Sequence, residues 1–265
     1  MNVRSFTHRV GEIDWYCEQQ GAGPHVILVP SGEGDCASFA ATAAHLASDF
    51  TVLTFDMPGF SRTSKPRDAE DILISKLADQ IAGLVSSLGA GRATFYGCSS
   101  GGVAVLDLLL RHPELVTNAL VHEVPFPGRK MPLNNLVALD DEGIIKACRD
   151  LFENVMNEDP NAWRALGPET HARLDKNYIT WVRRYVDPAR SRPSFNPSDF
   201  AGSSLDWTIG GLTPVAPFFS NVQFCAKAGI EIGMLMCRHF PQVSIPLALA
   251  EHIKQKTLRY LTGKN

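Results

Sequence analysis

The segment around residues 97–101 constrains the fold of this chain more than any other. It reads Gly97-Cys98-Ser99-Ser100-Gly101, follows the apolar run 93–96 and leads into an apolar segment that reaches Leu110. A strand, a turn of small residues and a helix form the context in which the pattern G-x-S-x-G places a serine at the apex of a strained turn. The Ser99 hydroxyl would then project beside a helix N-terminus, which favours negative charge. The segment predicts a nucleophile that attacks a carbonyl group; without that chemistry it would be a glycine-rich strand-to-helix turn.

The chain on both sides of this segment alternates short apolar runs with stretches of helical spacing. The run 26–30 is continuous and bounded by turn residues, which is typical of a strand covered on both faces in a parallel sheet. In 72–88 apolar residues recur at helical spacing, which predicts the helix that crosses over to the strand before Ser99. The strands expected in this way are 13–18 (at the edge), 26–30, 51–55, 93–96, 119–121, 205–210 and 232–236, and the helices are 39–47, 72–88, 100–112, 219–228 and 247–261. Such alternation predicts a doubly wound, mostly parallel α/β sheet with right-handed crossovers.

The alternation stops between residues 126 and 203. This segment carries helical patterns, best developed at 140–156 and 162–185, and a proline- and serine-rich return at 188–197. An insertion of this length between two strands would form a helical cap above the carboxyl edge of the sheet, where ligands of α/β proteins bind. We therefore expect a core domain of residues 1–125 and 204–265, and an inserted helical cap (lid) of residues 126–203.

Composition narrows the classes of partner. The net charge is −3 and no stripe of lysine and arginine is present, so we expect no nucleic-acid partner. No apolar run approaches the ~20 residues of a membrane helix, and the first residues lack the apolar core of a signal peptide, so we expect no membrane partner. The six cysteines are scattered without metal-ligand spacing, so we expect no metal site and free thiols in a reducing, cytoplasmic compartment. Both a monomer and a homodimer remain open.

A serine nucleophile needs a general base, and the base needs an orienting carboxylate. Of the eight histidines, His239 is the one in a loop after the final expected strand and before the final helix. In α/β hydrolases the order along the chain is serine, acid, histidine, and His239 fits the last place. His8 and His25 lie before the expected sheet, and His122 alternates with Glu123 on one strand, so these two side chains would point to opposite faces. We therefore predict that His239 is the base.

The acid has three candidates. Glu123 follows the strand 119–121 at its carboxyl end, the edge at which Ser99 is expected, and its side chain is long enough to reach across. Asp206 begins a strand and would lie at the opposite edge, and Asp56 is expected to accept hydrogen bonds from backbone donors of its own turn. We choose Glu123, with Asp206 and Asp56 as alternatives.

An oxyanion that forms during acyl transfer needs two N–H donors. The backbone N–H of Ser100, directly after the nucleophile, is expected to be one of them. Gly32 is the expected second donor, because the loop after the strand 26–30 contains Gly32 and Gly34, which let the backbone approach a substrate closely. Without this function the loop would be an ordinary turn.

Several further segments match one known family. They are Trp15-Tyr16 with Glu18, Leu28-Val29-Pro30, Thr54-Phe55-Asp56-Met57-Pro58-Gly59, Gly97-Cys98-Ser99-Ser100-Gly101, His122-Glu123, His171-Ala172-Arg173-Leu174, Lys176-Asn177-Tyr178 with Trp181, Leu205-Asp206-Trp207-Thr208 and His239-Phe240-Pro241. Over nearly its whole length the chain resembles the fungal zearalenone lactone hydrolases of the α/β-hydrolase superfamily. The pattern G-x-S-x-G is common among hydrolases, whereas the His-Glu pair and the segment around Trp181 are more specific.

The resemblance implies an α/β-hydrolase fold and a triad of Ser99, Glu123 and His239, in agreement with the choice from chain order. It also implies that Trp181 of the cap contacts a bound macrolactone and that Ser31, beside the oxyanion loop, belongs to the same substrate-binding region.

The chain departs from the family pattern at three places. The family has an aspartate where this chain has Ser31 and tends to have a histidine where Ile245 stands, and the segment 126–133 differs in sequence. These departures would change the polarity of the pocket and the substrate preference, but they leave the implied triad intact.

We therefore predict a cofactor-independent serine hydrolase that opens the lactone ring of a resorcylic acid macrolactone such as zearalenone. Its partner would be a hydrophobic small-molecule lactone, because an apolar pocket under a cap suits such a ligand. By analogy with the family, the ring-opened acid would then lose carbon dioxide. The alternatives are a hydrolase of another ester, lactone or C–C bond on the same triad, and a small-molecule receptor with a hydrolase fold.

Overall fold

The fold is built on one eight-stranded sheet. In a computed structural model, which describes residues 2–67, 72–126, 132–187 and 193–263, the strands lie in the order β1-β2-β4-β3-β5-β6-β7-β8. The pairs β1–β2 and β2–β4 are antiparallel, and every other neighbouring pair is parallel. The strands are β1 (Arg4–Val10), β2 (Ile13–Gln20), β3 (His25–Val29), β4 (Thr51–Phe55), β5 (Ala93–Cys98), β6 (Val116–His122), β7 (Leu205–Gly210) and β8 (Ile232–Leu235). The predicted doubly wound α/β fold is confirmed.

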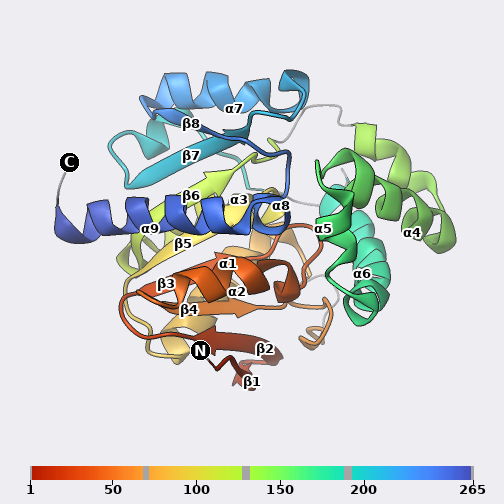
Figure 1. Cartoon of the computed structure of the whole chain (residues 1–265), viewed down its shortest axis with the longest axis horizontal. Coiled ribbons are helices and arrows are strands. Elements are labelled where there is room, and N and C mark those ends of the chain that lie inside the picture. Colours follow the sequence, from red (N-terminus) through yellow and green to blue (C-terminus); the bar gives the residue numbers. More distant parts are fainter. Residues whose placement is uncertain (1, 68–71, 127–131, 188–192, 264–265) are drawn as a thin grey trace.

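Helices cover the faces of this sheet. They are α1 (Ala40–Leu46) after the 3₁₀ turn η1 (Cys36–Phe39), α2 (Ile74–Ser87), α3 (Ser100–Arg111) with the 3₁₀ turn η3 (Pro113–Leu115), α7 (Val215–Ala228), α8 (Pro241–Ser244) and α9 (Pro246–Thr262). Helices α1 and α9 pack against each other, and α2 packs against α3. Helix α9 lies across the front of the sheet in Figure 1. The expected helix at 72–88 corresponds to α2, which buries its apolar side.

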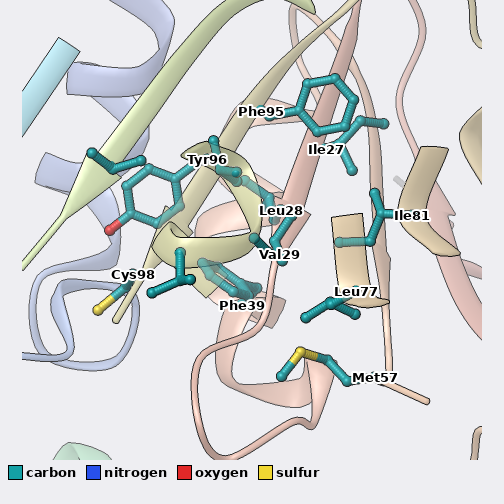
Figure 2. Close-up of a cluster of buried hydrophobic side chains, with 14 of the residues drawn as sticks. Ile27, Leu28, Val29, Phe39, Met57, Leu77, Ile81, Phe95, Tyr96 and Cys98 are labelled. Atoms are coloured by element: carbon teal, nitrogen blue, oxygen red, sulfur yellow. The ribbon is translucent and has the colours of Figure 1, made fainter. Parts of the chain in front are cut away.

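The core lies on both sides of the central strands. Ile27 of β3 is in register with Phe95 of β5, and Leu28 is in register with Tyr96. Because successive strand residues point to opposite faces, these two pairs belong to different layers. Figure 2 shows Ile27 and Phe95 close to Ile81 of α2, whereas Tyr96 lies on the side of Phe39. This packing holds the strand that leads to Ser99 from both faces.

The segment between β6 and β7 forms a group of helices that we call the helical insertion (described residues 132–187 and 193–203). It contains η4 (Pro132–Ala138), α4 (Asp141–Asp150) continued by the π-helix η5 (Leu151–Val155), α5 (Pro160–Arg164), α6 (Pro168–Trp181) continued by the π-helix η6 (Val182–Val186), and η7 (Pro197–Phe200). Figure 1 shows α4, α5 and α6 together beyond one end of the sheet. The division of the chain into a core domain and a cap at 126–203 stays a prediction.

Two sequence predictions are corrected by these elements. The expected helix 162–185 is interrupted, because Gly167 has φ 87° and Pro168 begins a new helix there. The expected edge strand 13–18 is β2, an inner strand, since β1 lies outside it. Strand β1 escaped prediction because most of its residues are exposed and its partly buried side carries only two apolar residues, Phe6 and Val10, with His8 between them.

Further consequences follow for the histidines and for two loops. His8 lies within β1 and His25 begins β3, so neither precedes the sheet. The expected return at 188–197 and the family departure at 126–133 lie partly outside the described residues.

In the part of the chain that the structure describes, every helix is too short or too polar to cross a lipid bilayer.

Candidate active site

Ser99 lies at the sharp turn between β5 and α3. Its backbone angles are φ 53° and ψ −121°, a region that non-glycine residues rarely adopt and that costs on the order of 1–3 kcal/mol. Its backbone N–H donates to the His122 carbonyl oxygen of the neighbouring strand at 2.9 Å. Ser99 as a whole residue is buried, with 8% of its surface exposed. The structure therefore presents this hydroxyl at the end of a strand and the start of a helix.

Two glycines make this turn possible. A Cβ added at Gly97 would lie 2.4 Å from the Gly101 carbonyl oxygen, and one added at Gly101 would lie 2.4 Å from the Pro30 carbonyl oxygen. Both distances are far below van der Waals contact, so strand, helix and the loop after β3 approach closely only because these residues lack side chains. The same packing brings the loop that starts at Ser31 next to Ser99.

Glu123 and His239 form a direct contact. Glu123 follows the end of β6 with φ 45°, and its Oε2 lies 2.7 Å from His239 Nδ1. Its Oε1 accepts a hydrogen bond of 2.9 Å from the Gly210 N–H. Burial alone would raise the pKa of Glu123, but the hydrogen bond and charge of His239, together with the Gly210 N–H, hold this pKa below its ordinary value. Glu123 is therefore an ionised carboxylate.

This contact sets the tautomer of His239. An ionised carboxylate only accepts hydrogen bonds, so Nδ1 carries the proton and Nε2 of the neutral ring is left as a proton acceptor. The imidazole is buried and stacks on Phe218 of α7, with ring centroids 5.1 Å apart. These two contacts fix the ring on its Nδ1 side and on one face.

The loop that carries His239 lies next to the turn that carries Ser99. The thiol of Cys98 donates to the His239 carbonyl oxygen at 2.9 Å, so the His239 loop lies directly beside the turn. Burial raises the pKa of Cys98 well above its ordinary value, which keeps the thiol protonated as a donor. Among the hydrogen bonds of the described residues, none joins the Ser99 hydroxyl to the imidazole. In serine hydrolases without substrate this bond is often long and forms when the substrate binds.

The alternative acids make other contacts. Asp206 Oδ1 pairs with Lys256 Nζ at 2.6 Å. Asp56 accepts hydrogen bonds from the Cys36 N–H and the Arg62 N–H, as expected for a carboxylate that satisfies backbone donors. Of the three candidates, Glu123 is the one that contacts His239.

The expected oxyanion loop lies against the helical insertion. A Cβ at Gly32 would be 2.4 Å from Trp181 Nε1, so the indole ring lies directly on this glycine. The Gly32 N–H donates to Ser31 Oγ at 2.5 Å, and an incoming oxyanion would have to replace this hydroxyl. The Ser100 N–H belongs to the first turn of α3, whose amides have no partner within the helix. Ser31, Gly32 and Trp181 therefore meet at one place.

A hollow opens beside the turn. The space between its walls is about 320 Å³, including the part open to solvent. Its lining residues are Ile74, Ser100, Val103, Pro125, Tyr185, Pro193 and Phe195. Ile245, the other departure from the family pattern, lies in the bend between α8 and α9 and lines a different surface hollow.

A buried ionic network joins the loop after β3 to the helical insertion. Asp35 is fully buried; Arg173 of α6 donates to its Oδ2 at 2.6 Å, and Arg62 donates to its Oδ1 at 3.2 Å. Ligand atoms of Asp35, Cys36 and Asp56 lie within 4.8 Å of one another, a spacing that suits a metal ion. The Arg62 guanidinium bonds to all three of these side chains, so a cation already occupies this place.

The sequence did not predict the residues that pack on His239 or that bond the helical insertion to the core. Phe218, Arg62 and Arg173 have no local pattern that announces these contacts, because each partner lies far away along the chain. Arg173 falls within a segment that carries the family resemblance, which is the one sequence signal available for it.

Comparisons with known proteins agree with this geometry. Residues 24–206 match the family model of the alpha/beta hydrolase fold. The chain is 40% identical over 267 residues to a zearalenone hydrolase of Bionectria ochroleuca, with 98% of this chain and 100% of the relative covered. It is 38% identical over 254 residues to a zearalenone hydrolase of Cladophialophora bantiana, with 94% of each covered.

Solved structures share the fold at lower identity. A thermophilic esterase from Thermogutta terrifontis superposes with a TM-score of 0.79 at 17% identity, covering 97% of this chain and 99% of the esterase. An epoxide hydrolase superposes with a TM-score of 0.75 at 15% identity, covering 100% of both chains. These structures show the fold. The family model and the two full-length relatives show that the chain belongs to the zearalenone hydrolase family of the α/β-hydrolase superfamily and is a hydrolase of carboxylic esters or lactones.

Proposed function

We propose that the protein opens the lactone ring of a resorcylic acid macrolactone such as zearalenone, using Ser99, His239 and Glu123. The observation that carries this proposal is the 2.7 Å contact between Glu123 Oε2 and His239 Nδ1 beside the Ser99 turn. Two relatives that span nearly the whole chain bear the name zearalenone hydrolase, which supports the choice of substrate.

The three residues have separate roles. Ser99 Oγ attacks the lactone carbonyl carbon while His239 Nε2 takes the hydroxyl proton. Glu123 stays ionised and stabilises the imidazolium that results. The N–H groups of Ser100 and Gly32 donate to the oxyanion, after the Ser31 hydroxyl has turned away from Gly32.

The second half of the reaction restores the enzyme. The bond between the carbonyl carbon and the ring oxygen breaks, and His239 gives its proton to the departing oxygen, which remains attached to the acyl group through the opened ring. His239 then takes a proton from water, the hydroxide attacks the acyl carbon, and Ser99 leaves with the proton from His239. The product is a hydroxy acid, which then loses carbon dioxide by analogy with the family.

The helical insertion acts as the cap in this proposal. Trp181 lies on Gly32, where it can contact a ring held at the oxyanion loop, and Ser31 lies next to the same amide. The hollow beside Ser100 is lined mainly by apolar side chains, which suits a hydrophobic lactone. We also propose a cytoplasmic location, supported by the six cysteines, which are all buried and free.

The experiment is turnover of zearalenone followed by mass spectrometry of the products. The wild-type protein is expected to give the ring-opened acid, with one added water, and then its decarboxylated product. Ser99→Ala should lower kcat by several orders of magnitude. Rapid hydrolysis of simple aryl esters with no turnover of zearalenone would reject the macrolactone, and undiminished turnover by Ser99→Ala would reject the nucleophile.

A further inference from the structure

The backbone of Arg238 and His239 makes hydrogen bonds to two parts of the molecule, the helical insertion and the core. Both N–H groups donate to the helical insertion: Arg238 N–H to Glu158 Oε2 at 2.7 Å, and His239 N–H to the Met156 carbonyl oxygen at 2.9 Å. Both carbonyl oxygens accept from side chains of the sheet strands, from His122 Nε2 and from the Cys98 thiol. The peptide that carries the proposed base therefore bridges the insertion and the core.

The Arg238 side chain strengthens the contact with the insertion. Its Nη1 lies 3.1 Å from the Asn154 carbonyl oxygen, 3.3 Å from that of Val155 and 3.2 Å from that of Asn157. With the bond from His239 N–H to Met156, every carbonyl oxygen from 154 to 157 accepts from Arg238 or His239. These carbonyls end the helix that runs through α4 and η5, where they lack partners within the helix and where a cation is favourable.

On the core side, His122 binds the carbonyl oxygen of Arg238. Burial lowers the pKa of His122 to about 4, so the ring is neutral. The Arg238 carbonyl can only accept, so His122 Nε2 carries the proton, at 3.3 Å, and Nδ1 accepts from the Thr208 hydroxyl at 2.9 Å. This side of the dipeptide is anchored within the sheet and does not depend on the insertion.

We propose that Arg238 is a positioning residue. Through it, the position of the His239 imidazole depends on whether the helical insertion is packed against the core. When the insertion is packed against the core, the loop that carries His239 is bonded to both the insertion and the sheet. In this state the imidazole can accept the proton of Ser99. When the insertion lifts, two backbone N–H groups and the guanidinium lose their partners. His239 then keeps its contacts with the core, through its carbonyl oxygen, Glu123 and Phe218. This inference rests on the proposed function, because it assigns the role of base to His239.

The test compares Arg238→Met and Arg238→Lys with a control, Arg149→Met. Methionine keeps most of the side-chain volume and removes the donors, whereas lysine keeps one cationic donor group. Arg149 is an arginine of the insertion whose partner, Asp175, also belongs to the insertion, so its loss leaves the His239 loop untouched. Each protein is assayed with zearalenone and with p-nitrophenyl acetate, and its thermal unfolding is recorded.

Arg238→Met is expected to lower kcat about 10- to 100-fold on both substrates, since a base displaced by about 1 Å costs rate on this scale, while KM changes less than about threefold. Lysine should recover part of the loss, and Arg149→Met should match the wild type. In NMR spectra, the far-downfield proton of His239 Nδ1, bonded to Glu123, should broaden in Arg238→Met and stay sharp in Arg149→Met. Unchanged kcat and an unchanged resonance in a folded Arg238→Met protein would overturn the inference, as would equal losses in both methionine variants.

Two further measurements separate the outcomes. If the wild type neither turns over zearalenone nor reacts at Ser99 with a fluorophosphonate, the proposed function itself fails; if it does both and Arg238→Met behaves like the wild type, only the coupling fails. Should Arg238→Met not fold, amide hydrogen exchange of the wild type decides. The amides of Arg238 and His239 should exchange together with that of Ile144 in the insertion, and exchange as slow as that of Leu120 in β6 would overturn the coupling.

Discussion

At the scale of single residues, strained backbone marks the candidate site. Ser99 and Glu123 are non-glycine residues with positive φ. Among the described residues the third is Ser61, which bonds to Asp35 in the network below the insertion. Such conformations persist only where the surrounding structure holds them, and they cluster at functional sites. In both Ser99 and Glu123 the strain follows the last residue of a parallel strand, which aims the side chain along the carboxyl edge of the sheet.

Glu123→Gln tests the acid. Glutamine keeps the shape and the bond from Gly210 N–H, but it lacks the charge that stabilises an imidazolium and can present an amide to His239 Nδ1 in the wrong sense. We expect kcat to fall on the order of 10²- to 10⁴-fold, as when the acid of a serine triad is neutralised. Steady-state kinetics on zearalenone provide the measurement.

Asp206→Asn is the matched control for this change. Asp206 pairs with Lys256, so its neutralisation is expected to leave kcat within about twofold of the wild type while lowering stability by less than about 1 kcal/mol. A large loss in Asp206→Asn with near-normal activity in Glu123→Gln would show that the acid was chosen wrongly.

The contact between Gly32 and Trp181 gives a second prediction at this scale. Gly32→Ala would place a methyl group 2.4 Å from Trp181 Nε1, so the indole must shift. We expect kcat/KM for zearalenone to fall about tenfold or more, and a double-mutant cycle with Trp181→Ala to show coupling of about 1 kcal/mol or more. Additive losses in the cycle would mean that Gly32 acts without Trp181.

At the scale of elements, helix α6 is fixed to the core by buried polar contacts. Arg173 bonds to Asp35, and the Asn177 amide donates to the Glu33 carbonyl oxygen and the Ser61 hydroxyl, both at 2.7 Å. Asn177 Oδ1 also accepts from the Ser61 N–H at 2.8 Å. The insertion is therefore tied to the core at two separated places, through α6 here and through the end of η5 at Arg238.

Asp35→Asn should release the first of these ties. Arg173 would lose the carboxylate with which it pairs, whereas Arg62 would keep Asp56. Removing one member of a buried ionic network is strongly destabilising. We expect the free energy of unfolding to fall by about 2–3 kcal/mol, as measured by urea denaturation. The control is Asp175→Asn, which breaks the more exposed pair with Arg149 and should cost less than about 1 kcal/mol. Equal losses in the two variants would contradict the structural role given to Asp35.

At the scale of the whole molecule, buried carboxyl groups affect the pH dependence of stability in opposite ways. Some contribute stability that is lost as the pH falls, and one contributes stability that is lost as the pH rises. Burial would raise the pKa of Asp35, but hydrogen bonds from Arg173 and Ser61 lower it overall, and the pKa of Glu123 is lowered through His239. Their contributions are present above the ordinary carboxyl pKa of about 4 and are lost as the pH falls through the lower folded values. Burial instead raises the pKa of Glu33, whose Oε2 has no hydrogen-bond partner among the described residues.

Glu33→Gln should therefore change the pH profile of stability. Because the folded state favours protonated Glu33, its contribution is full below the ordinary pKa and is lost as the pH rises toward the folded pKa. Glutamine removes this loss, so the variant should gain stability relative to the wild type between pH 4 and pH 7, measured by urea denaturation at both values. Glu251→Gln, at an exposed position of α9, should unfold like the wild type at both. A constant difference between Glu33→Gln and wild type would refute this assignment.

The sequence alone determined the class of fold and the serine turn. Continuous apolar runs, helical spacing and the glycines around Ser99 are local patterns, and each reports the burial or the backbone angles of its own segment. Strand β1 and the break at Gly167 escaped because exposed strands and single turns leave weak periodicity. The prediction of His239 and Glu123 as base and acid used chain order and the family resemblance, and their roles remain to be tested by kinetics.

Only the tertiary structure decided which groups meet. Glu123 and His239 contact each other across a sequence separation of 116 residues, and Arg238 reaches carbonyls more than 80 residues away. Such contacts depend on the register of β6 and β7 and on how the insertion packs above them, which no local pattern records. The physical reason is that periodicity encodes which face of a segment is buried, whereas a hydrogen bond between distant segments requires their relative position to be set to within a fraction of an ångström.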